Sequence, residues 1–230
     1  GIQVPKAALV TFVDNKVDTL AKSDIANGAF EFAGKVDGVT AAYIVFPGQQ
    51  GGIPVMVENT NITINADQTG LKIEGGEAQK LYNQFSAINQ GIMQEQMRLQ
   101  GEFQAANQAQ DQAKMQAIQE EFGKIVEAAQ AKELELLKAN ADTYVAAFVI
   151  ASAMGQMELD DLKARFALLG ENAKASTHGK SIAAQIAKLE QTAVGQIAPN
   201  FTVTTPEGEA ISLYDIKGKV KLVDFWASWC

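Results

Sequence analysis

Residues 81–103 read LYNQFSAINQGIMQEQMRLQGEF, and this stretch decides the fold of the central part of the chain. Apolar side chains recur in it at steps of three and four residues, which places them along one face of an α-helix. A second stretch with the same spacing follows. The two series are Leu81, Phe85, Ile88, Ile92, Leu99 and Phe103, and then Met115, Ile118, Phe122, Ile125, Ala129 and Leu136. Both are typical of helices that pack against each other along a seam.

The polar stretch Gln104–Gln112 lies between the two series and is expected to turn the chain. Asp111 is a suitable N-cap for the second helix, because its carboxylate can accept a hydrogen bond from a free N–H of the first turn. The pattern predicts a long antiparallel helical hairpin, with one continuous helix as the alternative. Asp142 and Ser181 are expected to cap the first and third of the shorter helices that follow. These are expected at Thr143–Met154, Glu158–Leu168 and Ser181–Thr192.

The first 76 residues have a different composition, with short runs of Val, Ile, Thr and Phe between turn residues. Asn27 and Gly28 both tolerate the positive φ of a type I′ turn, so they predict a β-hairpin. Strands are expected at Ala8–Val13, Phe30–Ala33, Tyr43–Phe46, Val55–Val57 and Ile62–Ala66. Together these elements predict a small antiparallel β-sandwich or open barrel.

From residue 194 onward strands return. Phe201–Thr204 and Ala210–Leu213 flank a turn at Pro206–Gly208, and Val220–Trp226 is an apolar run typical of a buried strand. The predicted fold class is therefore α+β, with a β domain over residues 1–76, a helical region over 77–193 and the opening strands of an incomplete domain over 194–230. We expect roughly the last thirty residues to be disordered, or to pair with a neighbouring chain's sheet edge, because their backbone groups lack partners.

The composition argues against several function classes. The net charge of −8 and the absence of a basic cluster disfavour binding to nucleic acid or to an anionic membrane surface. The most apolar stretch, Tyr144–Met154, is about half of the ~20 residues that span a bilayer, so no membrane span is expected. The sequence holds no phosphate-binding loop, dinucleotide fingerprint or zinc-ligand spacing, so neither a cofactor nor a metal site is expected.

The histidine and the methionines are interpreted as structural residues. His178 lies in the polar stretch Ser176–Lys180 and is expected to be a solvated loop residue. Met93, Met97 and Met115 lie at helical spacing and are expected to pack in the helical hairpin rather than to bind a metal.

The C-terminal stretch carries a specific pattern. It begins with Gly195-Gln196-Ile197-Ala198-Pro199-Asn200-Phe201, continues through a hairpin with Gly208 at its tip and the turn Lys217-Gly218-Lys219, and ends with Phe225-Trp226-Ala227-Ser228-Trp229-Cys230. Elements in this order closely resemble the opening of the redoxin group, which comprises the peroxiredoxins and the thioredoxin-like reductases of the bacterial envelope. The resemblance implies a thioredoxin-like domain whose motif continues in the family to a second cysteine, and this chain contains the first.

The resemblance also implies a role for three residues. Cys230 would be the attacking thiol, which forms a mixed disulfide with the substrate before a second cysteine resolves it. Trp229 would pack beside the disulfide and shape the substrate surface. Asp224 matches the buried acid of thioredoxins, which implies a proton relay for the resolving cysteine, and the alternative is a polar residue at a strand end.

Peroxiredoxin chemistry is the less favoured alternative within the redoxin group. A peroxiredoxin surrounds its cysteine with Pro-x-x-x-Thr-x-x-Cys, where the threonine hydroxyl helps to orient peroxide. At these positions the chain has Val223 and Ala227, neither of which can do this. Trp226 and Trp229 instead match the thioredoxin type.

The N-terminal part resembles a second family. It holds a Ser-x-x-x-x-Gly-x-Phe-x-Phe-x-Gly pattern, and the segment Gly75–Phe85 opens the helices. The residues of the pattern are Ser23, Gly28, Phe30, Phe32 and Gly34. Together these features are similar to the DUF4369-like β domain that precedes envelope thiol-disulfide oxidoreductases of the Bacteroides type.

The two resemblances together imply an AhpC/TSA-related thiol-disulfide oxidoreductase of the periplasm or cell envelope. Its implied partners are protein disulfide or dithiol substrates and an envelope electron donor. Because Gly1 stands in place of an initiator Met, an export signal or lipid anchor is expected to have been removed. The alternative function is a non-catalytic β and helical scaffold that forms a homodimer through the helical hairpin or docks a partner.

Overall fold

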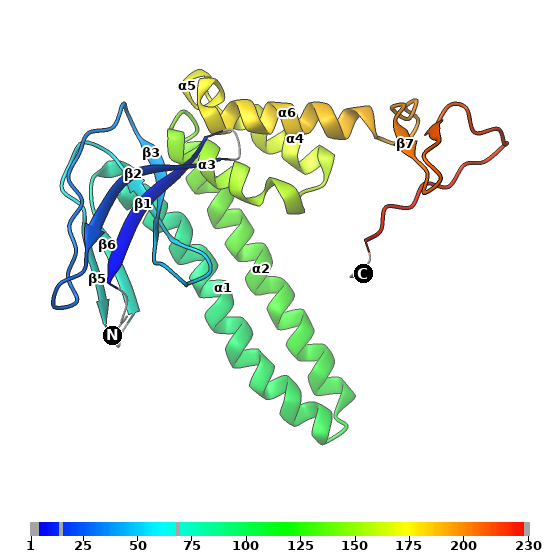
Figure 1. Cartoon of the computed structure of the whole chain (residues 1–230). Coiled ribbons are helices and arrows are strands. Elements are labelled where there is room, and N and C mark those ends of the chain that lie inside the picture. Colours follow the sequence, from blue (N-terminus) through cyan, green and yellow to red (C-terminus); the bar gives the residue numbers. More distant parts are fainter. Residues whose placement is uncertain (1–4, 14–15, 68–69, 228–230) are drawn as a thin grey trace. The chain divides into compact units, whose positions relative to one another are not determined.

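The computed structural model describes residues 5–13, 16–67 and 70–227. It divides into two compact units, residues 1–183 and 184–230, and each is described by itself. In the first unit the strands come first along the chain and the helices follow (Figure 1). The second unit contains the residues that carry the redoxin-like pattern.

Four strands of the first unit form one antiparallel sheet in the order β2-β1-β3-β4. Two more strands form a separate antiparallel pair, β5-β6. The bounds are Lys6–Val13 (β1), Lys16–Asp24 (β2), Thr40–Val45 (β3), Ile53–Val57 (β4), Thr63–Asp67 (β5) and Gly70–Glu74 (β6). The chain combines helices with antiparallel sheets, so the predicted α+β class is confirmed, and the sheets do not close into a barrel.

The apolar core of the β region lies between the four-stranded sheet and the strand pair. Ile62, Ile64 and Ile73, from β5 and β6 and the residue before β5, pack against a buried cluster on the sheet. The buried members of this cluster are Ala7, Leu9, Ala42, Ile44, Phe46 and Val55. Ile62 and Ile64 thus face a core on one side of the strand, as their alternation with polar residues predicts.

The strand predicted at Phe30–Ala33 is not formed, although two of its side chains pack in the core. Phe30 and Phe32 pack against the same cluster, with ring centroids 5.3 Å apart, but Phe30–Ala33 forms no strand. The turn before them is confirmed, because Asn27 and Gly28 have φ values of 53° and 76°. The residues on either side of that turn exchange two backbone hydrogen bonds, and the pairing ends there. Burial of the two rings, rather than a strand ladder, holds this segment.

Two observed strands, β2 and β6, were not predicted. Most side chains of β2 are exposed, so no apolar alternation marks it, yet it pairs with β1 along its length. β6 is also mostly exposed and pairs with β5. Hydrogen bonds between backbone groups hold both strands in place. Because their side chains are mostly exposed, the sequence shows no apolar alternation from which these strands could be predicted.

The long helical hairpin is confirmed, and a single continuous helix is excluded. α1 (Glu77–Gln108) and α2 (Gln112–Ala139) run side by side in opposite directions and project from the β region (Figure 1). Asp111 accepts a hydrogen bond from the Lys114 N–H at 3.0 Å, as predicted for the N-cap of α2.

A thin apolar seam holds the far part of the hairpin together. Leu99 and Ala106 of α1 and Ile118 of α2 are buried in it, and Met115 packs against them. Met115 therefore packs as predicted. Met93 and Met97 do not, because 60% and 64% of their surfaces are exposed.

Shorter helices follow the hairpin. They are α3 (Tyr144–Ala153), the 3₁₀ turn η1 (Met154–Gln156), α4 (Leu159–Leu168), α5 (Glu171–Ala175) and α6 (Thr177–Gln191). Half of the α3 side chains are fully buried, which explains its almost wholly apolar sequence. Within the described ranges, no helix has the length and apolar character needed to cross a membrane.

The cap predicted at Asp142 is wrong. Thr143 caps α3, because its hydroxyl accepts a hydrogen bond from the Ala146 N–H at 3.2 Å. Asp142 instead reaches α5, where its carboxylate accepts hydrogen bonds from the N–H groups of Asn172 and Ala173. Burial raises the pKa of Asp142. A hydrogen bond from the side-chain amide of Asn172, followed by those from the backbone N–H groups of Ala173 and Asn172, outweighs this effect and lowers the pKa below its usual value. The residue is a helix cap, supplied from thirty residues away in the sequence.

The cap predicted at Ser181 is wrong as well. α6 begins at Thr177, one turn earlier, so Ser181 lies inside the helix and donates to the Thr177 carbonyl. The N–H of Gly179 donates to the hydroxyl of Ser176, which therefore acts as the cap. The helix can start early because Gly179 and Ile182 pack in the interior.

In the second unit, β7 (Thr202–Thr204) and β8 (Ala210–Ser212) form an antiparallel hairpin. Both predicted strands are therefore confirmed, and the expected disorder is wrong for this hairpin. Val220–Trp226 has no regular secondary structure, so the strand predicted there is not formed. A strand needs a neighbour for its N–H and C=O groups, and the described residues supply none to this segment.

Candidate functional site

The predicted redox residues belong to the second unit. Asp224 lies in the described part of the chain, whereas Trp229 and Cys230 lie outside it. The side chain of Asp224 is exposed, on a segment without regular secondary structure. The resemblance implies a buried acid at this position. Such burial requires sheet neighbours for the segment, and none is found among the described residues.

Side-chain hydrogen bonds fix the hairpin that precedes this segment. Asn200 Oδ1 accepts hydrogen bonds from the Ser212 hydroxyl at 2.7 Å and from the Tyr214 N–H at 3.1 Å. The hydroxyl of Tyr214 donates to the Ala198 carbonyl at 2.7 Å. The chain before β7 is therefore held against the chain after β8. These roles were not predicted, because the partners of Asn200 lie 12 and 14 residues away in the sequence.

The segment Val220–Trp226, which leads toward Cys230, is rich in apolar residues that are typical of a protein core, yet most of its side chains are exposed. Lys221 Nζ donates to the Leu213 carbonyl at 2.8 Å, and the Phe225 and Phe201 ring centroids are 5.9 Å apart. The exposed fraction is nevertheless 93% at Leu222 and 76% at Trp226. An exposed apolar run of this kind is typical of an interaction surface.

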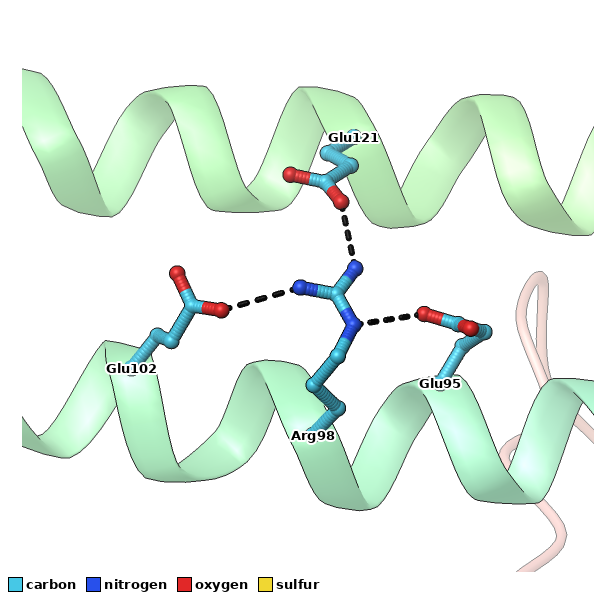
Figure 2. Close-up of polar contacts among 4 residues, drawn as sticks. All are labelled: Glu95, Arg98, Glu102 and Glu121. Atoms are coloured by element: carbon cyan, nitrogen blue, oxygen red, sulfur yellow. Dashed lines mark hydrogen bonds and ion pairs between the residues drawn. The ribbon is translucent and has the colours of Figure 1, made fainter.

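In the first unit, a charged cluster ties α1 to α2 (Figure 2). Arg98 on α1 donates from Nε to Glu95 at 2.7 Å and from Nη1 to Glu102 at 2.9 Å. From Nη2 it donates across to Glu121 on α2. Hydrogen bonds to Glu95 and then Glu121 raise the pKa of Arg98 above its usual value. Because all four side chains are nearly half exposed, the cluster fixes the register of the helices more than it adds stability.

His178 is not the solvated loop residue that was predicted. It lies half-buried in the first turn of α6, and its ring meets the rings of Tyr144 and Phe148 edge to face, at 5.2 and 5.1 Å between centroids. Burial lowers its pKa. The Tyr144 hydroxyl in turn accepts a hydrogen bond from the Ala41 N–H of β3 at 3.1 Å. His178 is therefore part of the packing that joins α6 and α3 to the sheet.

The stability of the first unit is expected to fall as the pH drops below about 6.5, the ordinary pKa of histidine. Burial lowers the pKa of His178 in the folded protein, so in this range the unfolded chain binds a proton that the folded chain does not. At higher pH both states carry neutral imidazole and the effect disappears. Urea unfolding at about pH 7.5 and about pH 5.5 measures it, with His178→Phe as the comparison.

His178 is the one histidine of the chain, so the two proteins differ in no other histidine titration. The wild type is expected to lose more stability between the two pH values than His178→Phe does. The same loss in both proteins would show that the imidazole is not the cause.

The surface of the first unit also has a large groove between α2 and α4. It has a volume of about 770 Å³ and is lined by charged and apolar side chains, including Leu134 and Asp161. Arg165 Nη1 donates to Glu133 at 2.6 Å and joins α4 to α2 beside it. Over the ranges that the structure describes, no three His, Cys, Asp or Glu side chains are grouped to hold a metal ion.

Comparisons with known proteins support both resemblances. Residues 2–82 match the model of a family described as a domain of unknown function, DUF4369. Over 44 residues the chain is 48% identical to the thiol-disulfide oxidoreductase ResA of Bacillus thuringiensis strain Al Hakam, which covers 19% of this chain and 25% of that protein. Over 36 residues it is 56% identical to the thioredoxin-like protein YneN of Bacillus subtilis strain 168, covering 16% and 21%. ResA of the same Bacillus subtilis strain is 40% identical over 47 residues, covering 20% and 26%.

These matches are short. The chain spans about a quarter of the length of the curated relatives it matches. No solved structure matches the chain. The chain is thus similar to DUF4369 over its N-terminal part, and to thiol-disulfide oxidoreductases and a thioredoxin-like protein over a short stretch.

Proposed function

We propose that this chain belongs to a thiol-disulfide oxidoreductase of the thioredoxin-like class that acts in the cell envelope. The similarity to relatives named thiol-disulfide oxidoreductase and thioredoxin-like protein, together with the sequence Trp226-Ala227-Ser228-Trp229-Cys230, carries this proposal. The DUF4369 match supports it, because the chain resembles envelope oxidoreductases in which such a β domain comes first. In this proposal residues 1–76 and 77–193 are accessory regions, and residues 194–230 open the catalytic domain.

In the proposed reaction, the thiolate of Cys230 attacks one sulfur of a substrate disulfide. A new S–S bond forms to Cys230, the substrate S–S bond breaks, and the second substrate sulfur leaves as a thiolate. A second enzyme thiol then attacks Cys230, which releases the substrate as a dithiol and leaves the enzyme oxidised. A dithiol donor of the envelope restores the enzyme, and the same steps in reverse oxidise a substrate dithiol. The chain has one cysteine, so the second thiol is not among its 230 residues.

Asp224 and Trp229 are proposed to assist Cys230. Asp224 would move a proton to or from the second thiol, a task for a positioned carboxyl group in a closed site. Trp229 would form part of the surface that receives the substrate polypeptide. Both roles require the Val220–Trp226 segment to be covered by a complete sheet, which its apolar side chains favour.

Reduction of insulin by the protein expressed from its natural gene tests the proposal. Cys230→Ser is expected to abolish turnover, because the attacking thiol is lost. Asp224→Asn is expected to slow turnover by about 10²-fold, the lower end of general acid–base contributions. Asp215→Asn is the matched control, because Asp215 is an exposed acid of the same unit outside the motif. Full turnover by Cys230→Ser, or rapid consumption of hydrogen peroxide by the wild type, would contradict the proposal.

The second candidate function is a non-catalytic scaffold that dimerises or docks a partner through the helical hairpin. The projection of α1 and α2 from the β region and the exposure of Met93 and Met97 favour it (Figure 1). Sedimentation of the Cys230→Ser chain, which cannot form disulfide-linked dimers, tests this function. A stable dimer would support the scaffold, and a monomer at all concentrations would count against dimerisation.

A further inference from the structure

The edges of the two β-sheets of the first unit face helix α1. β4 is an edge strand of its sheet, and among the described strands β6 pairs with β5 alone. Gln79 Oε1 accepts a hydrogen bond from the Met56 N–H of β4 at 2.7 Å. Asn83 Nδ2 donates to the Ile73 carbonyl of β6 at 2.8 Å, and Gln79 Nε2 donates to Asn83 Oδ1 at 2.7 Å. Two helix side chains thus bridge the two strands by a continuous chain of amide hydrogen bonds.

A groove continues from this amide chain along α1. Its volume is about 340 Å³, and its walls are the start of β4, residues Leu71 and Ile73 of β6, and the face of α1 that carries Gln90 and Met93. A second hollow of about 390 Å³ shares Leu71, Ile73 and Gln90 with this lining, and it is lined in addition by Lys72, Glu74 and Lys80. The 340 Å³ groove, called the α1 groove below, is lined by residues of the edge strand β4 on one side and of β6 on the other.

The α1 groove is electrically neutral in a chain of net charge −8. No charged side chain is among the described residues that line its 340 Å³. The charged side chains of Lys72, Glu74 and Lys80 line the second hollow instead, where Lys72 pairs with Glu74 at 2.7 Å. A charged ligand would therefore leave its charge without a partner in the groove, which is costly.

Apolar and amide groups lie side by side in the α1 groove. Leu71 and Met93 are 47% and 60% exposed, and the amide side chains of Asn89 and Gln90 are exposed beside them. A polypeptide in extended form presents the same two kinds of group, apolar side chains and backbone amides. Sheet edges bind such segments by strand addition, and methionine adapts to side chains of different shape.

We propose that the α1 groove binds an extended, uncharged and apolar polypeptide segment. The segment would lie between the edges of β4 and β6, beyond the point where Gln79 and Asn83 fill the gap. Its backbone would hydrogen-bond to the β6 edge and the exposed amides, and its apolar side chains would contact Leu71 and Met93. This binding is a property of the first unit and is independent of the thiol chemistry of Cys230.

Fluorescence anisotropy with a labelled peptide tests the proposal. The probe is a nine-residue peptide of alternating valine and serine with blocked ends, added to the full Cys230→Ser chain. Saturable binding is expected, and Leu71→Glu and Met93→Glu are each expected to weaken it about tenfold or more, because each places a charge in the groove. Val17→Glu is the matched control, since Val17 is a 62% exposed apolar residue of β2 outside the groove, and it is expected to leave binding unchanged. A peptide with two serines replaced by aspartate is expected to bind about tenfold more weakly.

Three results would overturn the proposal. The first is no saturable binding up to roughly 1 mM peptide, which is weaker than specific recognition requires. The second is equal weakening by Val17→Glu and Met93→Glu, which would indicate non-specific adsorption. The third is a dimer of the peptide-free chain that Met93→Glu dissociates, which would identify a second copy as the occupant. Met93 is exposed on α1, so this variant is expected to fold, and an unchanged thermal transition checks that it does.

Discussion

Gly179→Ala is expected to lower the free energy of unfolding of the first unit by about 3 kcal/mol, because overpacking a closed site forces the backbone to move. Gly179 is buried in the first turn of α6. A Cβ atom there would lie 2.3 Å from the Ala173 carbonyl oxygen and 2.5 Å from that of Lys174. Both oxygens belong to the backbone of α5, so no side chain can rotate away. The two helices would have to separate, which would also disturb the contacts of His178 with its aromatic neighbours.

Gly123→Ala is the control for this prediction. Gly123 lies in the middle of α2, and a Cβ atom there would meet no atom within 4 Å. Alanine is expected to stabilise the chain by about 0.5 to 1 kcal/mol, because glycine is the poorer helix former at an open position. Urea unfolding followed by circular dichroism measures both variants. Opposite signs are expected, and a neutral Gly179→Ala would show that α5 and α6 are not in close contact.

Gln79→Leu is expected to destabilise the first unit by about 3 kcal/mol, because it leaves buried polar groups without partners. Gln79 is fully buried, and its amide connects the Met56 N–H of β4 to Asn83. Leucine has a similar size but can neither accept nor donate a hydrogen bond. The N–H of Met56 would then face an apolar side chain, and the link between the two sheets would be broken.

Gln84→Leu is the control, because Gln84 is an exposed residue of the same helix. Its effect on stability is expected to stay within about 0.5 kcal/mol. Hydrogen exchange gives a second reading, in which the Met56 amide is expected to exchange faster in Gln79→Leu and at the normal rate in Gln84→Leu. Equal stability of both variants, with the Met56 amide still protected, would contradict the proposed chain of hydrogen bonds.

The sequence predicts correctly those elements whose stabilising residues lie close together in the chain. The helical hairpin followed from an apolar series that repeats within each helix, and Asp111 was recognised as a cap because its partner, Lys114, is three residues away. β2 was not predicted, because its backbone pairing with β1 holds it while its side chains stay exposed. Asp142 was misplaced because it caps α5, a helix that only the folded chain brings close to it.

The candidate functional features also divide into those formed by contiguous residues and those formed by distant segments. The pattern that ends at Cys230 predicts thiol-disulfide chemistry from the sequence alone, because its residue types and their order are contiguous in the sequence. The α1 groove was not predicted, since strands β4 and β6 and helix α1 form it together. His178 looked solvated in its polar stretch, but α3 supplies two aromatic rings that bury it. Contacts between distant segments decided the last two of these outcomes.

The most direct measurement is the sequence of the coding DNA on the 3′ side of the codon for Cys230. A thiol-disulfide oxidoreductase of the proposed type requires a Cys-x-x-Cys motif, because the second thiol resolves the mixed disulfide at the first. Two further codons followed by a cysteine codon are therefore expected. A stop codon, or a different residue at that position, would contradict dithiol chemistry at Cys230 and leave the scaffold function as the better explanation of the chain.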